Sequence, residues 1–321
     1  MIPVLIDTDP GIDDAVALML ALRRPEVEVL AVTACSGNLR ADYSAANALR
    51  VLDHVGRQDV PVAVGALAPL TRPYPKDPFS HGDDGLGNTG LPGPRGTPDE
   101  RFGPDLIVEL AAKHAGELTI IALGPLTNVA LALIRNPGLP RQVRQLVLTG
   151  GAFGLTPYSA LRATGDNPVS EWNVYVDPEA ARLVFHSGLH ITAVGLDVSC
   201  HPDINLSHGV RDRFGKSDSP EAQFITGVLA FVDAAGFESY SAIIDALTVA
   251  IAIDPGLAQT IPLNVDVETA SSLTLGQTVV DRREHFRWNH LPTIDVVSEV
   301  DYNAFHNLLL ATFEQRSMAR R

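Results

Sequence analysis

Short apolar runs alternate with amphipathic stretches along most of this chain of 321 residues. The runs are of strand length and end at Gly, Pro, Asp, Asn or Ser, which punctuate strands. The predicted strands are residues 3–6, 27–34, 62–64, 118–123, 145–149, 191–196, 263–267, 278–281 and 293–297. The predicted helices are residues 15–22, 41–54, 105–114, 129–135 and 301–313, a helix opened by Asp177 and Pro178, and most of 206–253. This alternation predicts an α/β fold with a mainly parallel, open, Rossmann-like sheet and helices on both faces.

Two longer stretches show neither the apolar runs of strands nor the amphipathic pattern of helices. Residues 65–104 are dense in Gly and Pro, and residues 154–168 are irregular. A segment as long as the first is uncommon inside a compact α/β domain, so we expect it to be a functional flap. Glu171 and Asn173 flank the bulky Trp172, which predicts an extended segment with both polar groups on one face. No internal repeat or compositional break marks a boundary, so we expect a single domain over residues 1–321.

The first predicted strand ends in a cluster of acids. The sequence there is Asp7-Thr8-Asp9-Pro10-Gly11-Ile12-Asp13-Asp14-Ala15, in which Asp-Pro-Gly forces a turn before the first helix. Helix capping would account for Asp13 and Asp14 but not for Asp7 and Asp9. Acids this close repel one another, so the cluster predicts a bound cation at the strand end where α/β sheets bind ligands. Oxygen ligands without nearby Cys or His favour calcium or magnesium.

This nine-residue stretch resembles the N-terminal signature of the nucleoside hydrolases, the inosine-uridine-preferring nucleoside N-ribohydrolase family. The family motif, DxDPGxDDA, is met at every fixed position, and residues 81–88 resemble the family's HGxDGLGN loop. The similarity covers nearly the whole chain and is strongest over residues 4–40, 79–88, 121–130 and 171–185. It implies the nucleoside hydrolase fold and a calcium-dependent hydrolysis of the ribonucleoside N-glycosidic bond, through an oxocarbenium-like transition state.

The resemblance also implies roles for individual residues. The implied Ca²⁺ ligands are Asp9, Asp14, Asp245 and the Leu123 carbonyl; the implied ribose-binding residues are Asp13, Asn38, Glu171 and Asn173; the catalytic candidates are Asp9, as the base that takes a proton from water, and His81. Asp7 is expected to lie behind the site as a supporting acid. Structural alternatives stay open: a turn residue for Asn38, a solvated helix acid for Asp245, surface positions for Glu171 and Asn173, and a loop histidine for His81.

Two departures from the family pattern concern the half of the site that would hold the base. Many members carry a histidine just before the position of Asp245, where it is thought to protonate the leaving base, but this chain has Ile244. Residues 165–168 fit the family's Asn-containing segment only loosely. Leaving-group protonation must therefore come from another group, with His81, Tyr240 and water as candidates, and the base preference is open.

Composition restricts the partners. A formal net charge of −14 argues against a nucleic-acid backbone or an anionic membrane as partner. No apolar run approaches a membrane span, and the N-terminal residues lack the pattern of a signal peptide. Two cysteines, Cys35 and Cys200, give no disulfide framework and fit a reduced, cytoplasmic setting. The family suggests a homodimer or homotetramer acting on a small nucleoside.

Two other functions stay open on the sequence. A magnesium-dependent phosphatase of the haloacid-dehalogenase-like class would use Asp7 as its nucleophile, but its DxDx(T/V) motif does not continue into Pro-Gly-x-Asp-Asp, and Lys76, Lys113 and Lys216 lie in no recognisable phosphate-binding motif. A non-catalytic relative that binds ribose or nucleoside without turnover is suggested by Ile244.

Overall fold

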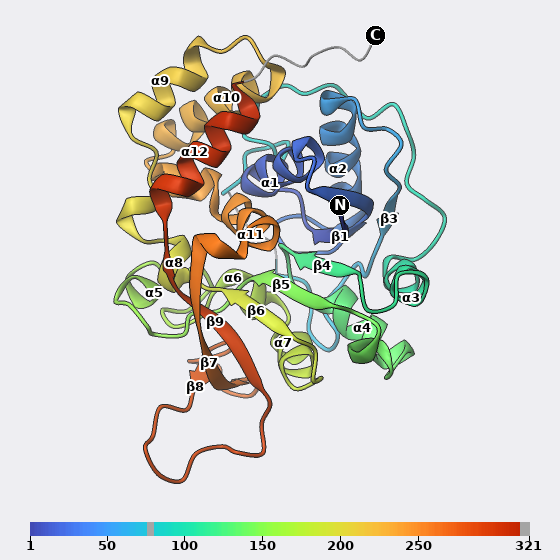
Figure 1. Cartoon of the computed structure of the whole chain (residues 1–321), viewed down its shortest axis with the longest axis vertical. Coiled ribbons are helices and arrows are strands. Elements are labelled where there is room, and N and C mark those ends of the chain that lie inside the picture. Colours follow the sequence, from blue (N-terminus) through green and yellow to red (C-terminus); the bar gives the residue numbers. More distant parts are fainter. Residues whose placement is uncertain (76–79, 315–321) are drawn as a thin grey trace.

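The computed structural model describes residues 1–75 and 80–314, and within them nine strands form one sheet (Figure 1). The strands are β1 (Ile2–Thr8), β2 (Val27–Ala34), β3 (Val62–Val64), β4 (Thr119–Ala122), β5 (Gln145–Thr149), β6 (Ile191–Val194), β7 (Ala258–Val267), β8 (Thr278–Val280) and β9 (Thr293–Val300). Their spatial order is β3-β2-β1-β4-β5-β6-β9-β7-β8. The first seven strands in that order are parallel, and β7 and β8 extend the sheet in antiparallel pairing.

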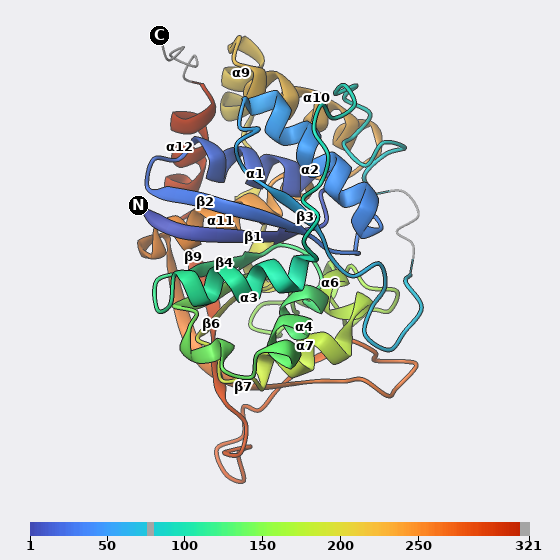
Figure 2. The ribbon, with the colours of Figure 1, turned by 90° about the vertical axis from the view of Figure 1, so that its right-hand side faces the viewer.

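Helices cover both faces of this sheet. They are α1 (Ile12–Arg23), α2 (Ala41–Val55), α3 (Gly103–Lys113), α4 (Thr127–Arg135), α5 (Tyr158–Leu161), α6 (Trp172–Val176), α7 (Pro178–Phe185), α8 (Leu196–Ser199), α9 (His208–Lys216), α10 (Pro220–Ala234), α11 (Ile244–Ile253) and α12 (Tyr302–Phe313). Four short 3₁₀ helices are η1 (Leu139–Arg141), η2 (Pro202–Ile204), η3 (Ser239–Ala242) and η4 (Pro255–Leu257). Figure 2 shows α1 and α2 on one side of β1 and β2, and α3, α4 and α7 on the other. The predicted α/β class and two-sided cover are confirmed.

The order of the strands fixes where a ligand can bind. The chain runs outward from β1 through β2 to β3 and then returns to place β4 on the other side of β1. The loops after β1 and β4 therefore diverge to opposite faces, which opens a crevice at the carboxyl ends of these two strands. The acid-rich loop follows β1, and Leu123 follows β4.

The core consists of two apolar layers, one on each face. Helix α1 is central to the first, because its positions from Ala15 to Leu22 are all buried, and it packs against α2, α10, α11 and α12. The second layer joins α3, α4 and α7 to the opposite face of the sheet. Apolar residues all round α1 explain why its sequence shows little amphipathic pattern. Within the described residues, no helix combines the length and apolar character required to cross a membrane.

Most predicted elements are present, and two local predictions are wrong. Residues 154–168 contain the short helix α5, and residues 171–173 are not extended. Instead Glu171 caps α6, because its carboxylate accepts the N–H groups of Asn173 and Val174 at 2.8 and 3.0 Å. An acid that caps a helix binds the free N–H groups of the first turn, so this sequence starts a helix rather than a strand.

The predicted flap, residues 65–104, is irregular where it is described, apart from a bridge between Ala63 and Asp99 and the start of α3. Residues 76–79 of this segment lie outside the described residues. The start of the segment is attached to α7, because Asp177, which caps that helix, also accepts the N–H of Leu70 at 2.8 Å. The carboxylate of Glu179 also receives hydrogen bonds from Arg72. Flap closure over a ligand stays a prediction.

Candidate active site

The loop from β1 to α1 brings its acids together at the sheet crevice. Asp14, in the first turn of α1, accepts the N–H of Gly11 at 3.0 Å and the hydroxyl of Thr8 at 2.5 Å. The Asn38 amide adds a third contact to Asp14, at 3.2 Å. Asp14 is fully buried, and these donors fix its carboxylate in one orientation at the helix N-terminus.

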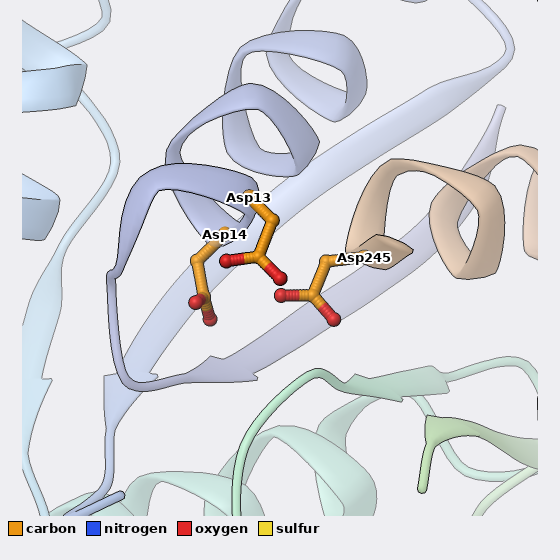
Figure 3. Close-up of side chains that lie close together, drawn as sticks. All are labelled: Asp13, Asp14 and Asp245. Atoms are coloured by element: carbon orange, nitrogen blue, oxygen red, sulfur yellow. The ribbon is translucent and has the colours of Figure 1, made fainter. Parts of the chain in front are cut away.

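Three carboxylates converge on one point. Ligand atoms of Asp13, Asp14 and Asp245 lie within 4.8 Å of one another, and Figure 3 shows them facing the same space from the starts of α1 and α11. Asp245 is buried, with 3% of its surface exposed, so it is not the solvent-exposed helix residue that the sequence left open as an alternative. Burial, followed by the charges of Asp13 and Asp14, holds the pKa of Asp245 well above its usual range. Such a cluster is stabilised by a cation, and its oxygen donors suit a hard one.

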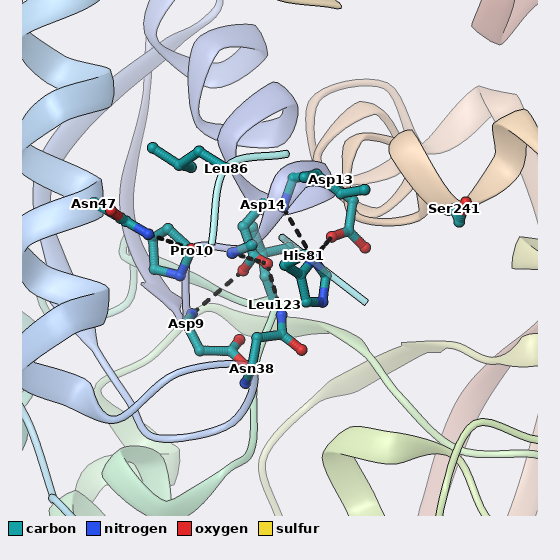
Figure 4. A network of polar contacts seen from close by, with 12 residues as sticks. Asp9, Pro10, Asp13, Asp14, Asn38, Asn47, His81, Leu86, Leu123 and Ser241 are labelled. Atoms are coloured by element: carbon teal, nitrogen blue, oxygen red, sulfur yellow. Dashed lines mark hydrogen bonds and ion pairs between the residues drawn. The ribbon is translucent and has the colours of Figure 1, made fainter. Parts of the chain in front are cut away.

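Asp9 lies beside this cluster and is fully buried. One carboxylate oxygen accepts the N–H of Asn38 at 2.5 Å, while the other, Oδ1, has no hydrogen-bond partner among the described residues. Burial and the charge of Asp14 hold the pKa of Asp9 well above its usual range. Figure 4 shows Asp9, Asp14 and Asn38 in one polar network. A buried oxygen without a donor needs a proton or a cation, so Asp9 fits a metal ligand.

Two glycines make room for Asp9. A Cβ atom on Gly37 would lie 2.0 Å from Oδ2 of Asp9, and one on Gly124 would lie 2.2 Å from Oδ1. Any side chain at either position would therefore displace the carboxylate. Gly37 precedes Asn38, and Gly124 follows Leu123, so the glycines belong to the two strand-end loops that form the crevice.

The loop after β4 faces a second group of polar residues. The amide of Asn173 donates to the Leu123 carbonyl at 2.7 Å and to the Thr149 carbonyl at 3.1 Å. Glu171 receives three backbone N–H groups, two from α6 and one from Gly151 at 3.1 Å. Burial still raises the pKa of Glu171 above its usual range. Both residues are buried, which excludes the surface alternative, and their anchored side chains form one wall of the crevice.

His81 lies over the N-terminus of α1. Its Nδ1 accepts the N–H of Ile12 at 3.1 Å and lies 3.9 Å from Oδ1 of Asp13 (Figure 4). An accepting Nδ1 places the proton of the neutral ring on Nε2, which makes His81 a hydrogen-bond donor. Its loop is fixed by Asn47 of α2, whose amide donates to the carbonyls of Pro10 and Asp84 at 3.2 and 3.1 Å.

Asp7 supports the site from beneath. It is fully buried, and its Oδ1 accepts the Thr33 hydroxyl at 2.5 Å and the Asn128 amide at 2.8 Å. Burial raises the pKa of Asp7 to about 7. Asp7 is fully buried beneath the loop and its Oδ1 is bound by two donors, so its position does not favour a phosphatase with Asp7 as nucleophile.

A cavity of about 580 Å³ opens above these residues. It gathers seven predicted site residues in one wall and floor: Asp13, Asn38, His81, Leu123, Glu171, Asn173 and Asp245. Asp9 and Asp14 lie just below, within hydrogen-bond distance of Asn38. The rest of the wall includes an apolar and aromatic part that the sequence prediction covered only at Ile244 and Tyr240, and its other members include Trp172, Tyr175, Val194, Leu196 and Phe237.

Residues 165–168, which fit the family's Asn-containing segment only loosely, contribute both to the cavity wall and to the structure around it. Gly165 and Asp166 line the cavity, whereas Asn167 is structural. The Asn167 amide donates to the Leu275 carbonyl at 2.8 Å, and its oxygen accepts the Ser170 hydroxyl at 3.0 Å. The cavity therefore has no asparagine from this segment.

The fold and the cavity are those of an α/β enzyme with an acidic site at the switch point of its sheet. The family model for inosine-uridine preferring nucleoside hydrolases matches residues 4–307. A pyrimidine-specific ribonucleoside hydrolase, RihA, from Citrobacter koseri is 37% identical over 314 residues, which cover 96% of each chain.

Solved structures of nucleoside hydrolases have the same fold as this chain. A plant nucleoside hydrolase, PpNRh1, superposes with a TM-score of 0.86 at 32% identity, covering 98% of this chain and 99% of that one. A purine-preferring ribonucleoside hydrolase from Gardnerella vaginalis gives a TM-score of 0.84 at 28% identity, covering 97% of each. The chain belongs to the inosine-uridine-preferring nucleoside hydrolase family, whose members are hydrolases of N-glycosyl bonds.

The close packing of Gly124 against Asp9 gives a first prediction. Gly124→Ala should displace the Asp9 carboxylate and lower kcat for nucleoside hydrolysis by roughly 10²-fold, the effect of a misplacement of about 1 Å. Gly93→Ala is the matched control, since a Cβ there meets nothing within 4 Å. Circular dichroism would verify that both variants fold. A Gly124→Ala enzyme with the wild-type rate would contradict this account of Asp9.

The raised pKa values give a second prediction. Asp7, with a pKa of about 7, binds more protons in the folded than in the unfolded chain between about pH 4 and 7. Stability from such a group is present at low pH and is lost as pH rises through the folded-state pKa. With a chelator present, the thermal unfolding midpoint should therefore decrease as the pH is raised from 5 to 8. Asp7→Asn should flatten this dependence, and an unchanged pH profile in that variant would count against the assignment.

Proposed function

We propose that this protein hydrolyses the N-glycosidic bond of ribonucleosides in a calcium-dependent reaction, releasing a free base and ribose. The observation that carries the proposal is the convergence of the half-buried Asp13 carboxylate with the buried carboxylates of Asp14 and Asp245, beside the unpaired oxygen of Asp9. Family membership supports the reaction class, and the donor chemistry supports the metal.

The residues present fit a hard divalent cation. Asp9, Asp14, Asp245 and the Leu123 carbonyl would hold Ca²⁺, which binds six to eight oxygens and so leaves positions for substrate and water. Asp13 also belongs to the converging cluster and would either share the cation or bind a ribose hydroxyl. When bound, the ion would supply Lewis acidity that lowers the pKa of the attacking water.

The chain's own groups would do the remaining work. Asp9 would take the proton of the attacking water, because its carboxylate is held by Asn38 at the floor of the cavity, beside the other proposed calcium ligands. Asp13, Asn38, Glu171 and Asn173 would orient the ribose from the cavity wall. Carboxylates fixed around the sugar would also stabilise the positive charge that develops there. His81, which lies beside Asp13, would donate a hydrogen bond from Nε2 to the bound substrate.

Substrate preference and setting extend this proposal. A relative with 37% identity is named as pyrimidine-specific, so we infer that uridine and cytidine are substrates. The cavity volume of about 580 Å³ leaves ample room for a nucleoside. We also infer a cytoplasmic, homo-oligomeric enzyme, a homodimer or homotetramer, from the reduced state of Cys35 and Cys200 and from the family pattern.

The metal prediction tests this proposal directly. Asp14→Ala should abolish calcium binding and uridine hydrolysis together, because Asp14 supplies one of the converging carboxylates. Asp203→Ala, at a side chain that is 74% exposed, is the control and should keep both. Metal content is measured by elemental analysis, and turnover by the release of reducing sugar.

Zinc in the purified protein, or full activity in the Asp14→Ala variant, would refute the proposal. A protein that binds ribose but does not turn over any nucleoside with calcium would instead support the non-catalytic alternative suggested by Ile244.

A further inference from the structure

The cavity lacks a histidine where a departing base would need a proton donor. Ile244, the first residue of α11, lines the cavity next to Asp245 and offers only hydrocarbon. A positioned acid is typically worth roughly 10²–10⁴-fold in rate. The following inference rests on the proposed ribohydrolase function and concerns which group replaces that acid.

Several polar groups of the cavity are already engaged. The Ser241 hydroxyl donates to the Glu238 carbonyl at 2.7 Å, and the Thr149 hydroxyl pairs with Thr248 at 2.7 Å. Burial and the neighbouring Asp166 carboxylate raise the pKa of the Tyr175 phenol, and among the described residues no cation in contact with it acts as strongly in the opposite direction. His81 is tied to the start of α1 beside Asp13, in the acidic part of the cavity. The remaining aliphatic hydroxyls are weaker acids than a phenol, whose ordinary pKa is about 10.

Tyr240 is the phenol that lies on the same short segment as Ile244. It belongs to η3, which leads directly into α11, and both residues line the cavity. The Tyr240 N–H donates to the Asn205 side-chain oxygen at 3.0 Å. The hydroxyl of Ser239 donates to the same oxygen at 3.1 Å, so η3 is fixed by Asn205.

A guanidinium group lies against Tyr240. The Arg162 carbon Cζ is 4.7 Å from the centre of the Tyr240 ring. Arg162 is held there by Glu238, with two hydrogen bonds of 3.0 and 2.7 Å, and the Asn205 amide donates to Glu238 at 2.7 Å. Two segments distant in the sequence, those of Arg162 and Asn205, thus converge on the segment that carries Glu238 and Tyr240.

We propose that Tyr240 is the acid that protonates the leaving base and that Arg162 is a positioning residue that stabilises the phenolate formed. As the bond from C1′ to nitrogen breaks, its electron pair goes to the base, and the Tyr240 hydroxyl proton is transferred to that base. Water adds its oxygen to C1′ and loses a proton to Asp9. After the base leaves, Asp9 releases its proton to solvent and Tyr240 regains one from solvent, so the cycle closes without an added reactant.

The electrostatics agree with this division of roles. Burial raises the pKa of Tyr240, so the phenol carries its proton at neutral pH, and the positive charge of Arg162 acts in the opposite direction. A cation beside a phenol favours its charged form, which is the form produced by proton transfer.

The test compares uridine with p-nitrophenyl riboside, whose leaving group departs as a stable anion. Tyr240→Phe should lower kcat on uridine by roughly 10²–10⁴-fold while p-nitrophenyl riboside stays within about threefold of wild type. KM for uridine should change little, because the lost interaction forms only in the transition state. Across ribosides with graded leaving groups, log kcat should depend more steeply on leaving-group pKa in Tyr240→Phe.

Arg162 is tested by two variants. Arg162→Met should reproduce the selective loss on uridine to a smaller extent, about tenfold, and Arg162→Lys should recover part of it because a cation is retained. Tyr43→Phe and Arg135→Met are matched controls: Tyr43 is 63% exposed and lies 5.7 Å from Arg40, and Arg135 lies 5.4 Å from the ring of Phe102. Both controls should keep wild-type rates on both substrates.

Equal losses on both substrates in Tyr240→Phe, or no loss on uridine, would overturn this assignment, as would a selective uridine defect in His81→Gln alone. These results differ from failure of the proposed function, in which the wild-type protein would cleave neither riboside in calcium.

Discussion

Mutual repulsion among buried carboxylates is the constraint on which this structure depends. Asp7, Asp9, Asp14 and Asp245 are all buried, and Asp13 faces the last two. Burial raises the pKa values of Asp7, Asp9 and Asp245, and the charges of neighbouring acids raise those of Asp9 and Asp245 further. A sheet that collected these acids with no compensation would be destabilised, so the arrangement requires protons or a cation. That requirement couples the stability of the fold to its function.

The surrounding fold holds the acids in place rather than separating them. Each arrives at the switch point of the sheet or at the start of a helix, where N–H groups and hydroxyls fix its orientation. Gly37 and Gly124 have no side chain and so allow two loops to close on Asp9. The second half of the cavity is apolar and aromatic, which excludes water and strengthens the electrostatic interactions at the floor.

The sequence predicted the features that depend on local pattern. The strand, turn and helix from β1 to α1 were readable because apolar run, Asp-Pro-Gly and helix formers follow one another directly. Asp245 was located by its resemblance to a family motif and by its apolar neighbours, which made a lone acid there conspicuous. Glu171 was correctly placed at the cavity, but the extended backbone predicted for residues 171–173 was wrong. The alternation of polar residues with Trp172 is compatible with a capped helix as well as with a strand.

Features that arise only from tertiary contact were beyond the sequence. Arg162, Asn205 and Glu238 are far apart along the chain, and each alone resembles an ordinary surface residue. The buried Asn47, a polar residue on the inner face of α2, was a signal that could have been used. The position of Asp13 within the converging carboxylates likewise depends on how α1 and α11 pack.

The central claim is that the acidic floor holds one calcium ion without which the enzyme is inactive. Its most direct test is a titration of chelator-treated protein with Ca²⁺, following ribose release from uridine. Activity should return in proportion to added calcium and saturate at one ion per chain. Full activity in excess chelator, or recovery with zinc but not calcium, would contradict the account.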